Sequence, residues 1–199
     1  MTKVGLLGCG ALVLVVIVIG AMVLGGGYNS LVTGEEAVKS AWSQVENVYQ
    51  RRADLIPNLV ATVKGVANFE KDTYTAVTEA RAKVGQIKVT SDMLSDPNAI
   101  AKFQQAQGEL GSALSRLLVV SENYPELKAN QNFLDLQSQL EGTENRISTE
   151  RRNFNLAAQN YNTMLRRFPR NMVASMFGFK EKAYFAAEEG SNKAPEVKF

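Results

Sequence analysis

The stretch FLDLQSQLEGTENRISTERRNFNLAAQNYNTMLRRF, residues 133–168, contains a bulky apolar side chain at every seventh position. These residues are Phe133, Leu140, Ile147, Phe154, Tyr161 and Phe168, and a largely apolar companion column contains Leu136, Thr143, Glu150, Ala157 and Met164. A seven-residue repeat with two such columns keeps one face of an α-helix apolar. The stretch therefore predicts a helix of about 35 residues that buries one face.

Shorter amphipathic stripes upstream supply surfaces on which this helix can pack. They comprise Val38, Ala41, Val45, Val48, Leu55, Leu59, Thr62, Val66 and Phe69, and then Ile100, Phe103, Leu110, Leu114 and Leu117. The long helix alone also fits one half of a dimeric coiled coil. The upstream stripes need partners too, however, and four amphipathic helices satisfy one another. We therefore expect an all-α fold with an antiparallel, four-helix-type bundle formed within one chain.

Capping and helix-breaking residues place the ends of the expected helices. Thr33 and Glu36 have the spacing of a capping box, which predicts that the first helix of the bundle begins there. Pro57 removes one backbone hydrogen bond, so we expect a kink within residues 54–58 and helix resuming to about residue 84. Asp96 followed by Pro97 predicts the start of the next helix, which runs to about residue 122.

Residues 4–24, VGLLGCGALVLVVIVIGAMVL, contain no charged residue. At about 1.5 Å per residue, a helix of this length spans the roughly 30 Å hydrocarbon core of a bilayer. A cleaved secretory signal is the alternative, with the glycines at 25–27 as its exit, whereas lipidation of Cys9 is disfavoured because the apolar run follows the cysteine. We expect residues 1–27 to form a transmembrane anchor with a flexible glycine collar, residues 28–185 the bundle, and residues 186–199 a polar tail.

The charge balance bears on partners and on orientation. The chain has 22 basic and 20 acidic residues without a basic patch, which disfavours binding to nucleic acid. Lys3 precedes the span, whereas the first basic residue after it is Lys39, beyond Glu35 and Glu36. The positive-inside bias therefore places the bundle outside the cytoplasm, although this bias depends on one lysine and the amino terminus.

Arg52 interrupts the first stripe, since it lies seven residues from both Val45 and Leu59. A buried guanidinium needs a carboxylate or several carbonyl groups around it. Glu144 and Glu150 lie beside or within the apolar columns of the long helix. Two interpretations stay open: Arg52 pairs with one of these acids and fixes the helix register, or its stem reaches the edge of the bundle and keeps the charge in water.

The segment after the long helix is unusually apolar. Arg166 and Arg167 suit the last helical turn, which Pro169 ends. Large apolar side chains follow: Met172, Val173, Met176, Phe177, Phe179, Tyr184 and Phe185. We expect them to pack along the bundle; the alternative is a surface for a partner or a membrane. The candidate structural or interaction residues are Arg52, Pro57, Glu144, Glu150, Phe177 and Phe179.

The chain contains no histidine, which excludes several kinds of catalytic and metal site. These are Ser-His-Asp and Cys-His centres, histidine-ligated zinc and the Glu-x-x-His di-iron sites of helical bundles. An all-carboxylate metal site from Glu109, Glu141, Glu144 and Glu150 is formally available, but a solvated helix face is the expected role of such acids. The glycines at 108 and 111 lack the lysine and the strand of a phosphate loop. We expect no catalytic residue, no metal and no cofactor.

Several motifs resemble those of the LemA family of bacterial membrane-anchored proteins. They are YNSLV (28–32), AWSQVEN (41–47), QRRADLIPNLV (50–60), EGTENRI (141–147), YN (161–162), FP (168–169) and FGF (177–179). The resemblance covers nearly the whole chain and implies a single N-terminal span and an antiparallel helical bundle. It implies no agreed activity, although a magnetosome-forming relative hints at membrane organisation, and a shared fold does not by itself assign a function.

Two hypotheses about function follow. The first is a non-enzymatic, membrane-tethered bundle in the bacterial inner membrane that scaffolds partners or organises lipid, alone or through self-association. The second is an adaptor or regulator of another membrane complex, such as a protease, which docks through the region of Pro57 or the aromatic tail. What purifies with the intact protein discriminates between them, since copies of itself favour the first and a stoichiometric foreign partner the second. An enzyme that uses only carboxylates and arginines ranks third.

Overall fold

The computed structural model describes residues 2–66 and 69–186, with the side chains of residues 2–11 and 13 outside the description. Its elements are α1 (Thr2–Lys64), α2 (Lys71–Gln86), the 3-10 helix η1 (Ser91–Ser95), α3 (Pro97–Ser121), α4 (Pro125–Lys128), α5 (Gln131–Arg166) and α6 (Arg170–Phe177). These described residues contain no strand, and the predicted all-α fold is confirmed. Of the expected tail at 186–199, only Ala186 belongs to them.

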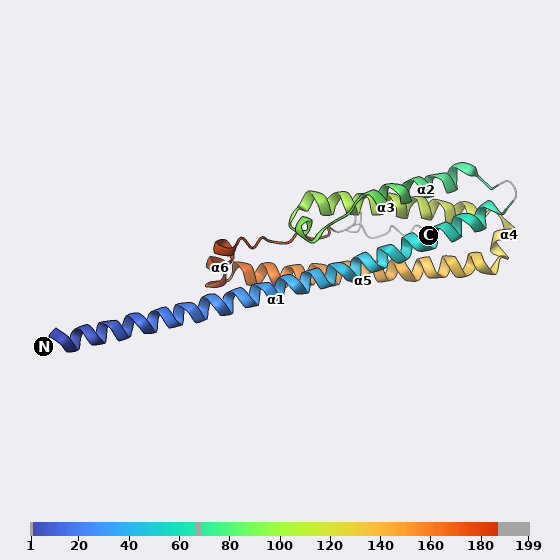
Figure 1. The fold of residues 1–199 in the computed structure, drawn as a ribbon. Coiled ribbons are helices and arrows are strands. Elements are labelled where there is room, and N and C mark those ends of the chain that lie inside the picture. Colours follow the sequence, from blue (N-terminus) through green and yellow to red (C-terminus); the bar gives the residue numbers. More distant parts are fainter. Residues whose placement is uncertain (1, 67–68, 187–199) are drawn as a thin grey trace, which may run out of the picture.

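The helices form an elongated antiparallel bundle from which the first part of α1 projects (Figure 1). The second part of α1 packs along α5, which runs in the opposite direction, and these two helices share the largest interface. The hairpin of α2 and α3 lies on this pair, while α6 lies beside α1 and α5 at the end that adjoins the projecting segment. The antiparallel, four-helix-type bundle that the sequence predicts is therefore present.

The projecting part of α1 is the one helix among the described residues that is long and apolar enough to cross a membrane. Its described side chains lie open to the surroundings, as in Leu14 and Met22, which are 63% and 70% exposed. α1 has 63 residues and is therefore about 95 Å long, so about a third of it is available for a span. The remainder belongs to the bundle.

The flexible collar expected at residues 25–30 is absent, because α1 is continuous through it. Gly27, and Gly34 beyond this stretch, allow close packing, whereas a Cβ on Gly25 or Gly26 would meet open space. A Cβ on Gly27 would lie 3.1 Å from the Val173 side chain, and one on Gly34 would lie 3.1 Å from Tyr161 and 2.5 Å from Met164. Gly27 and Gly34 are seven residues apart and belong to the buried seam of α1, so they allow α5 and α6 to approach its backbone.

Two predicted helix ends are also wrong. Thr33 and Glu36 form no capping box, because the Thr33 hydroxyl donates to the carbonyl of Asn29 (2.9 Å) and Glu36 accepts from Lys39 (2.7 Å) inside α1. The first helix does not run to residue 84 either: α1 ends at Lys64 and α2 begins at Lys71. Gly65, a poor helix former, directly follows the end of α1. The end of α1 was not recognised in the sequence because buried Phe69 continues the apolar pattern across the turn.

The later helices match their sequence signals closely. Asp96 caps α3 by accepting a hydrogen bond from the backbone N–H of Asn98 (2.9 Å), and α3 ends at Ser121. The predicted stripe of α3 is buried, as are the first five residues of the seven-residue column on α5. The sixth, Phe168, is 78% exposed, because α5 ends at Arg166 and the column ends with it.

Candidate functional site

A buried polar layer crosses the middle of the bundle and is centred on Arg52, which is only 3% exposed. Its Nη1 donates to Glu144 Oε2 of α5 over 2.8 Å. Its Nη2 donates to the backbone carbonyl of Gln107 on α3 over 3.2 Å and to the Oε1 of the same residue. The guanidinium carbon lies 5.1 Å from the centre of the Tyr49 ring. One arginine thus joins α1, α3 and α5.

The polar layer separates two apolar cores. One contains Tyr49 and the α1 residues before it, together with Phe103 and Ile147; the other contains Ile56 and the α1 residues after it, together with Leu110 and Leu140. A lengthwise slip of α3 or α5 would separate the guanidinium from Gln107 or Glu144. Because a buried charge without partners is costly, the layer favours one register of the three helices.

The structure separates the remaining candidates from this layer. Glu150 accepts from Asn153 one turn away on its own helix (3.0 Å), so Glu144 is the acid that contacts Arg52. Pro57 lies inside α1 with its side chain exposed, and the helix continues through it. A docking role for the Pro57 region stays a prediction. Sequence reasoning missed the buried Gln107, although its spacing, four residues after Phe103 and three before Leu110, places it on the α3 stripe.

The C-terminal strap, which we define as residues 179–186, is an extended segment held by three side-chain amides. Asn162 accepts from the N–H of Lys182 (2.8 Å) and donates to its carbonyl (2.9 Å). Asn155 does the same for Phe185 (2.9 and 3.0 Å), and Gln104 for Ala186 (3.1 and 3.0 Å). An amide has one acceptor and a donor group, so each satisfies both polar groups of one residue.

A buried lysine fixes the same strap to the start of the bundle. Lys182 is 6% exposed, and its Nζ donates to Glu35 Oε1 of α1 (2.7 Å) and to the Ser95 hydroxyl (3.3 Å). Its ammonium also lies 5.6 Å from the centre of the Tyr161 ring. Burial, with a smaller contribution from the charge of Glu35, raises the pKa of Tyr161 to about 12. The sequence offered little signal for the strap, because its residues show no periodicity.

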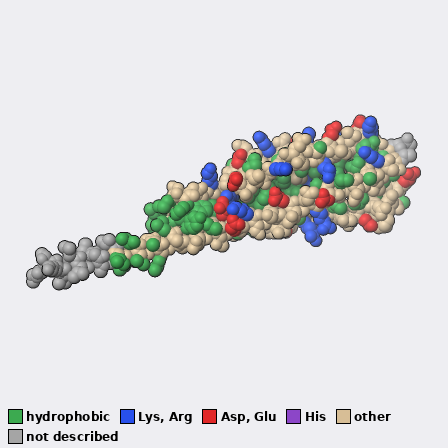
Figure 2. All heavy atoms as spheres, in the orientation of Figure 1, with side chains coloured by type: hydrophobic (Ala, Val, Ile, Leu, Met, Phe, Trp, Pro, Cys, Tyr) green, Lys and Arg blue, Asp and Glu red, His purple; other side chains and the backbone are tan. Residues whose placement is uncertain are grey.

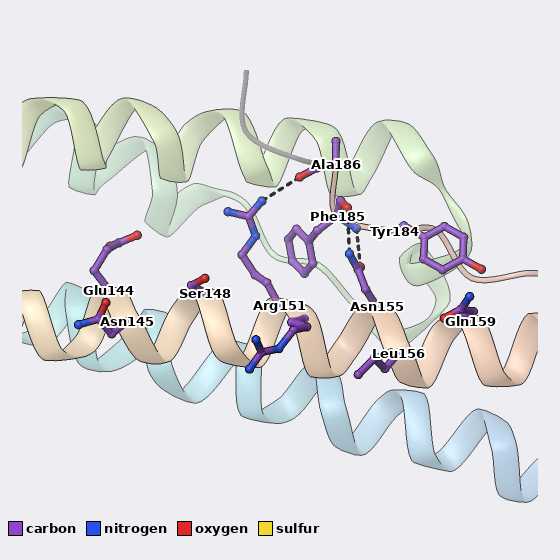
Figure 3. Close-up of a pocket in the computed structure, with 11 residues that line it drawn as sticks. Glu144, Asn145, Ser148, Arg151, Asn155, Leu156, Gln159, Tyr184, Phe185 and Ala186 are labelled. Carbon is purple, nitrogen blue, oxygen red and sulfur yellow. Dashed lines mark hydrogen bonds between the residues drawn. The ribbon is translucent and has the colours of Figure 1, made fainter. Parts of the chain in front are cut away.

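A surface groove of about 790 Å³ runs between α5 and the end of the strap (Figure 3). Its lining comprises Glu144, Asn145, Ser148, Arg151, Arg152, Asn155, Leu156, Gln159 and residues 184–186. Arg151 Nη2 donates to the carbonyl of Ala186 over 3.0 Å, and its guanidinium carbon lies 5.1 Å from the centre of the Phe185 ring. Of the polar residues that line this groove, Arg151 and Asn155 hold the strap, and Glu144 pairs with Arg52.

Aromatic residues meet where α6 packs on α1. The Tyr28 ring lies edge-on to Phe177 and Phe179, with centroid distances of 4.9 and 5.7 Å. The apolar segment is divided: Val173 and Phe185 pack in the bundle and Phe179 is half-buried, whereas Phe177 is 54% exposed. The expectation that the segment packs holds for one part of it, and the alternative of an open surface holds for the other.

The buried charged groups described above, Arg52 and Lys182, make contacts that hold separate segments of the chain together. Among the described residues, no three acids or cysteines come close enough together to hold a metal ion. The Glu181 carboxylate accepts from Arg166 through both oxygens (2.6 and 2.7 Å), which lowers the pKa of Glu181 and ties the strap to the end of α5. These ion pairs and hydrogen bonds position the helices and the strap, and the aromatic surface around Phe177 stays exposed.

Residues 41–199 match the sequence model of the LemA family, and this range includes the bundle from the middle of α1 onward. The chain belongs to the LemA family. It is 30% identical over 174 residues to Magnetosome protein MamQ 2 and Magnetosome protein MamQ 1 of Paramagnetospirillum magneticum, covering 79% of this chain. It is 26% identical over 164 residues to Protein LemA of Metamycoplasma hominis, covering 82% of this chain and 71% of that protein.

This LemA-family chain spans 64% of the length of the magnetosome relatives that it matches. The matched range begins inside α1, after the seam that contains Gly27 and Gly34 has started. It includes Arg52, Gln107 and Glu144, so the whole polar layer lies within the family domain.

Proposed function

We propose that this LemA-family chain is a non-enzymatic scaffold tethered to the bacterial inner membrane through the first part of α1. The observation that carries the proposal is the continuity of α1, whose exposed apolar part leads without a break into the core of the bundle. A rigid connection of this kind holds the bundle at one orientation to the bilayer. Tethering also raises its effective concentration for neighbours at the membrane surface.

Several contacts support a rigid role. The polar layer around Arg52 joins three helices, and Lys182 and Glu35 join the strap to α1 near the membrane end. The buried charges are thus occupied in fixing helices relative to one another, which is what a scaffold needs and a catalytic centre does not. The likeness to relatives named as magnetosome proteins supports a scaffolding role.

The rigid connection can be tested at Gly26, where a side chain would meet open space. Gly26→Pro removes a backbone hydrogen bond within α1 and should bend it, whereas Gly26→Ala should leave it straight. We expect native-lipid particles of wild type and Gly26→Ala to contain several copies of the chain, and Gly26→Pro particles to contain one. Equal copy numbers in all three would contradict the rigid-scaffold proposal.

A second function is an adaptor or regulator of another membrane complex. The exposed aromatic surface next to Tyr28, which includes Phe177, favours this alternative. Proximity labelling from the bundle in intact cells discriminates the two. Self-labelling supports the scaffold, and one stoichiometric foreign protein supports the adaptor. The same labelling tests sidedness, for which Lys3 before the span favours a bundle outside the cytoplasm.

A further inference from the structure

An apolar surface without a partner in the structure lies where α6 packs on α1. We call it the juxtamembrane apolar face, and it consists of Tyr28, Phe168, Met172, Met176 and Phe177, which are 40%, 78%, 61%, 66% and 54% exposed. Figure 2 shows hydrophobic side chains gathered at the end of the bundle that adjoins the projecting helix, with charged side chains beginning beside them. The surface of a soluble protein rarely exposes so many large apolar side chains together.

α6 is amphipathic, because its opposite face is buried against the bundle. Val173 and Ala174 are 1% and 2% exposed and pack with Leu31 of α1. The exposed residues of α6 therefore point away from the core as a consequence of how the helix is docked. Their exposure is a stable feature of the fold and does not need α6 to detach.

The packing of Val173 on Gly27 sets the level of α6 along α1. Gly27 lies three residues beyond the apolar stretch 4–24, which corresponds to about 4.5 Å of helix. The headgroup zone on each side of a roughly 30 Å hydrocarbon core is about 5–8 Å thick. If the first part of α1 spans the bilayer, as our proposed function requires, α6 lies at headgroup depth.

The charge around α6 also suits a phospholipid surface. Residues 166–181 contain four basic residues and one acid, Glu181, which is engaged by Arg166. The α1 residues from 25 to 34 carry no charge. An apolar face with a basic rim is the composition of helices that lie in the membrane interface, where long basic side chains reach the lipid phosphates.

We propose that α6, with Phe168 and Tyr28, lies in the headgroup zone of the bilayer that holds α1. Met172, Met176 and Phe177 face the acyl chains there, and Arg167 and Lys180 reach lipid phosphates. Lipid is the occupant because the face is continuous with the spanning helix and lies at the depth of its end. The chain is therefore held at two points, and the second point fixes the tilt and rotation of the bundle.

A fluorescent probe on the full chain tests this placement. Cys9 is the only cysteine, so a Cys9→Ser background accepts single probes at Met176→Cys, at Leu156→Cys on α5 and at Val16→Cys in the expected span. The native side chains at these positions are 66%, 51% and 60% exposed, so all three sites are more than half open in the structure. Each chain is placed alone in a nanodisc of phosphatidylcholine and phosphatidylglycerol that carries nitroxide lipids.

We expect aqueous iodide to quench the probe at Leu156→Cys several-fold more than the probe at Met176→Cys. Headgroup-level nitroxides should quench the probe at Met176→Cys most, and deep nitroxides the probe at Val16→Cys. Iodide quenching of Met176→Cys equal to that of Leu156→Cys overturns the inference and leaves the tether intact. Shielding of Met176→Cys from iodide without nitroxide quenching also overturns it, because protein then covers the face. If deep nitroxides do not quench the probe at Val16→Cys, the result contradicts the membrane tether itself.

Discussion

The polar layer makes a quantitative prediction about two acids on the same helix. The Glu144 side chain is 57% exposed, whereas that of Arg52 is 4% exposed. Water therefore weakens the attraction between the two charges but cannot accept from every buried N–H of Arg52 in place of Glu144. Glu144→Gln should therefore lower the free energy of unfolding by about 1–2 kcal/mol, the value of a charge-assisted hydrogen bond at a partly screened site. Glu150→Gln is the matched control and should change it by less than about 0.5 kcal/mol.

Replacing the arginine separates charge from packing. Arg52→Met removes a desolvated guanidinium but leaves the 5% exposed Gln107 side chain without its partner, which costs about 1–3 kcal/mol. Adding Gln107→Leu removes the stranded amide, so the double variant should return to within about 1 kcal/mol of wild type or exceed it. Buried ion pairs often behave in this way when apolar side chains replace every member.

Urea unfolding of the full chain in detergent micelles, followed by far-ultraviolet circular dichroism, measures these free energies. A double-mutant cycle between Arg52→Met and Glu144→Gln should give a coupling of about 1–2 kcal/mol, and the same cycle with Glu150→Gln a coupling near zero. Equal losses for the two glutamine variants, or additive losses for Arg52→Met and Glu144→Gln, would refute the reasoning. The pair would then be a contact without net energetic value.

Three further predictions concern packing, ionisation and the strap. Gly34→Ala should lower stability by about 1 kcal/mol because its Cβ meets neighbouring side chains, whereas Gly26→Ala should raise it by up to about 1 kcal/mol in the same urea assay. Tyr161 has a pKa raised to about 12, so the unfolded chain loses this proton first and stability falls as pH rises from 10 to 12. Tyr161→Phe should remove part of that fall, and an identical alkaline profile would contradict the assignment. Asn162→Ala should expose residues 179–186 to limited proteolysis, whereas Asn160→Ala, also on α5, should not; equal protection would show that the amide is dispensable.

The parts of the fold that the sequence predicts are those that depend on local periodicity. The column from Phe133 to Tyr161 and the cap at Asp96 need only neighbouring residues, so their positions are right. The position of Arg52 on a regular seam identifies it as a candidate for burial, but the sequence left open a stem that reaches the edge of the bundle. Which acid pairs with Arg52, Glu144 or Glu150, depends in contrast on the register of α5 against α1 and on Gln107 of α3. The sequence of one helix considered alone does not contain this information.

One of the errors, the flexible collar, arose because glycine has two roles. The glycines within residues 25–30 indicate a flexible collar when α1 is considered alone, but Gly27 lies where α6 packs closely on α1, as Gly34 further along lies where α5 does. Only the path of α5 and α6 distinguishes close packing from flexibility. The strap was missed for a related reason: Asn155 and Asn162 have the spacing of one helix face, but what they bind is a backbone without pattern.

The register of α5 and the proposed membrane placement of α6 are coupled. The polar layer fixes α5 against α1 at Glu144, and α6 follows the end of the same continuous helix, so a slip of one seven-residue repeat would move α6 by about 10 Å along α1. That distance exceeds the thickness of the headgroup zone. Arg52→Met with Gln107→Leu should therefore stay folded yet lose a unique placement of α6. Spin labels at Leu24→Cys and Met176→Cys, in the Cys9→Ser background, should report one distance in the wild-type bundle and a broader or divided distribution in the double variant. A single unchanged distance would show that the glycine contacts of α1 are sufficient to set the register without the arginine.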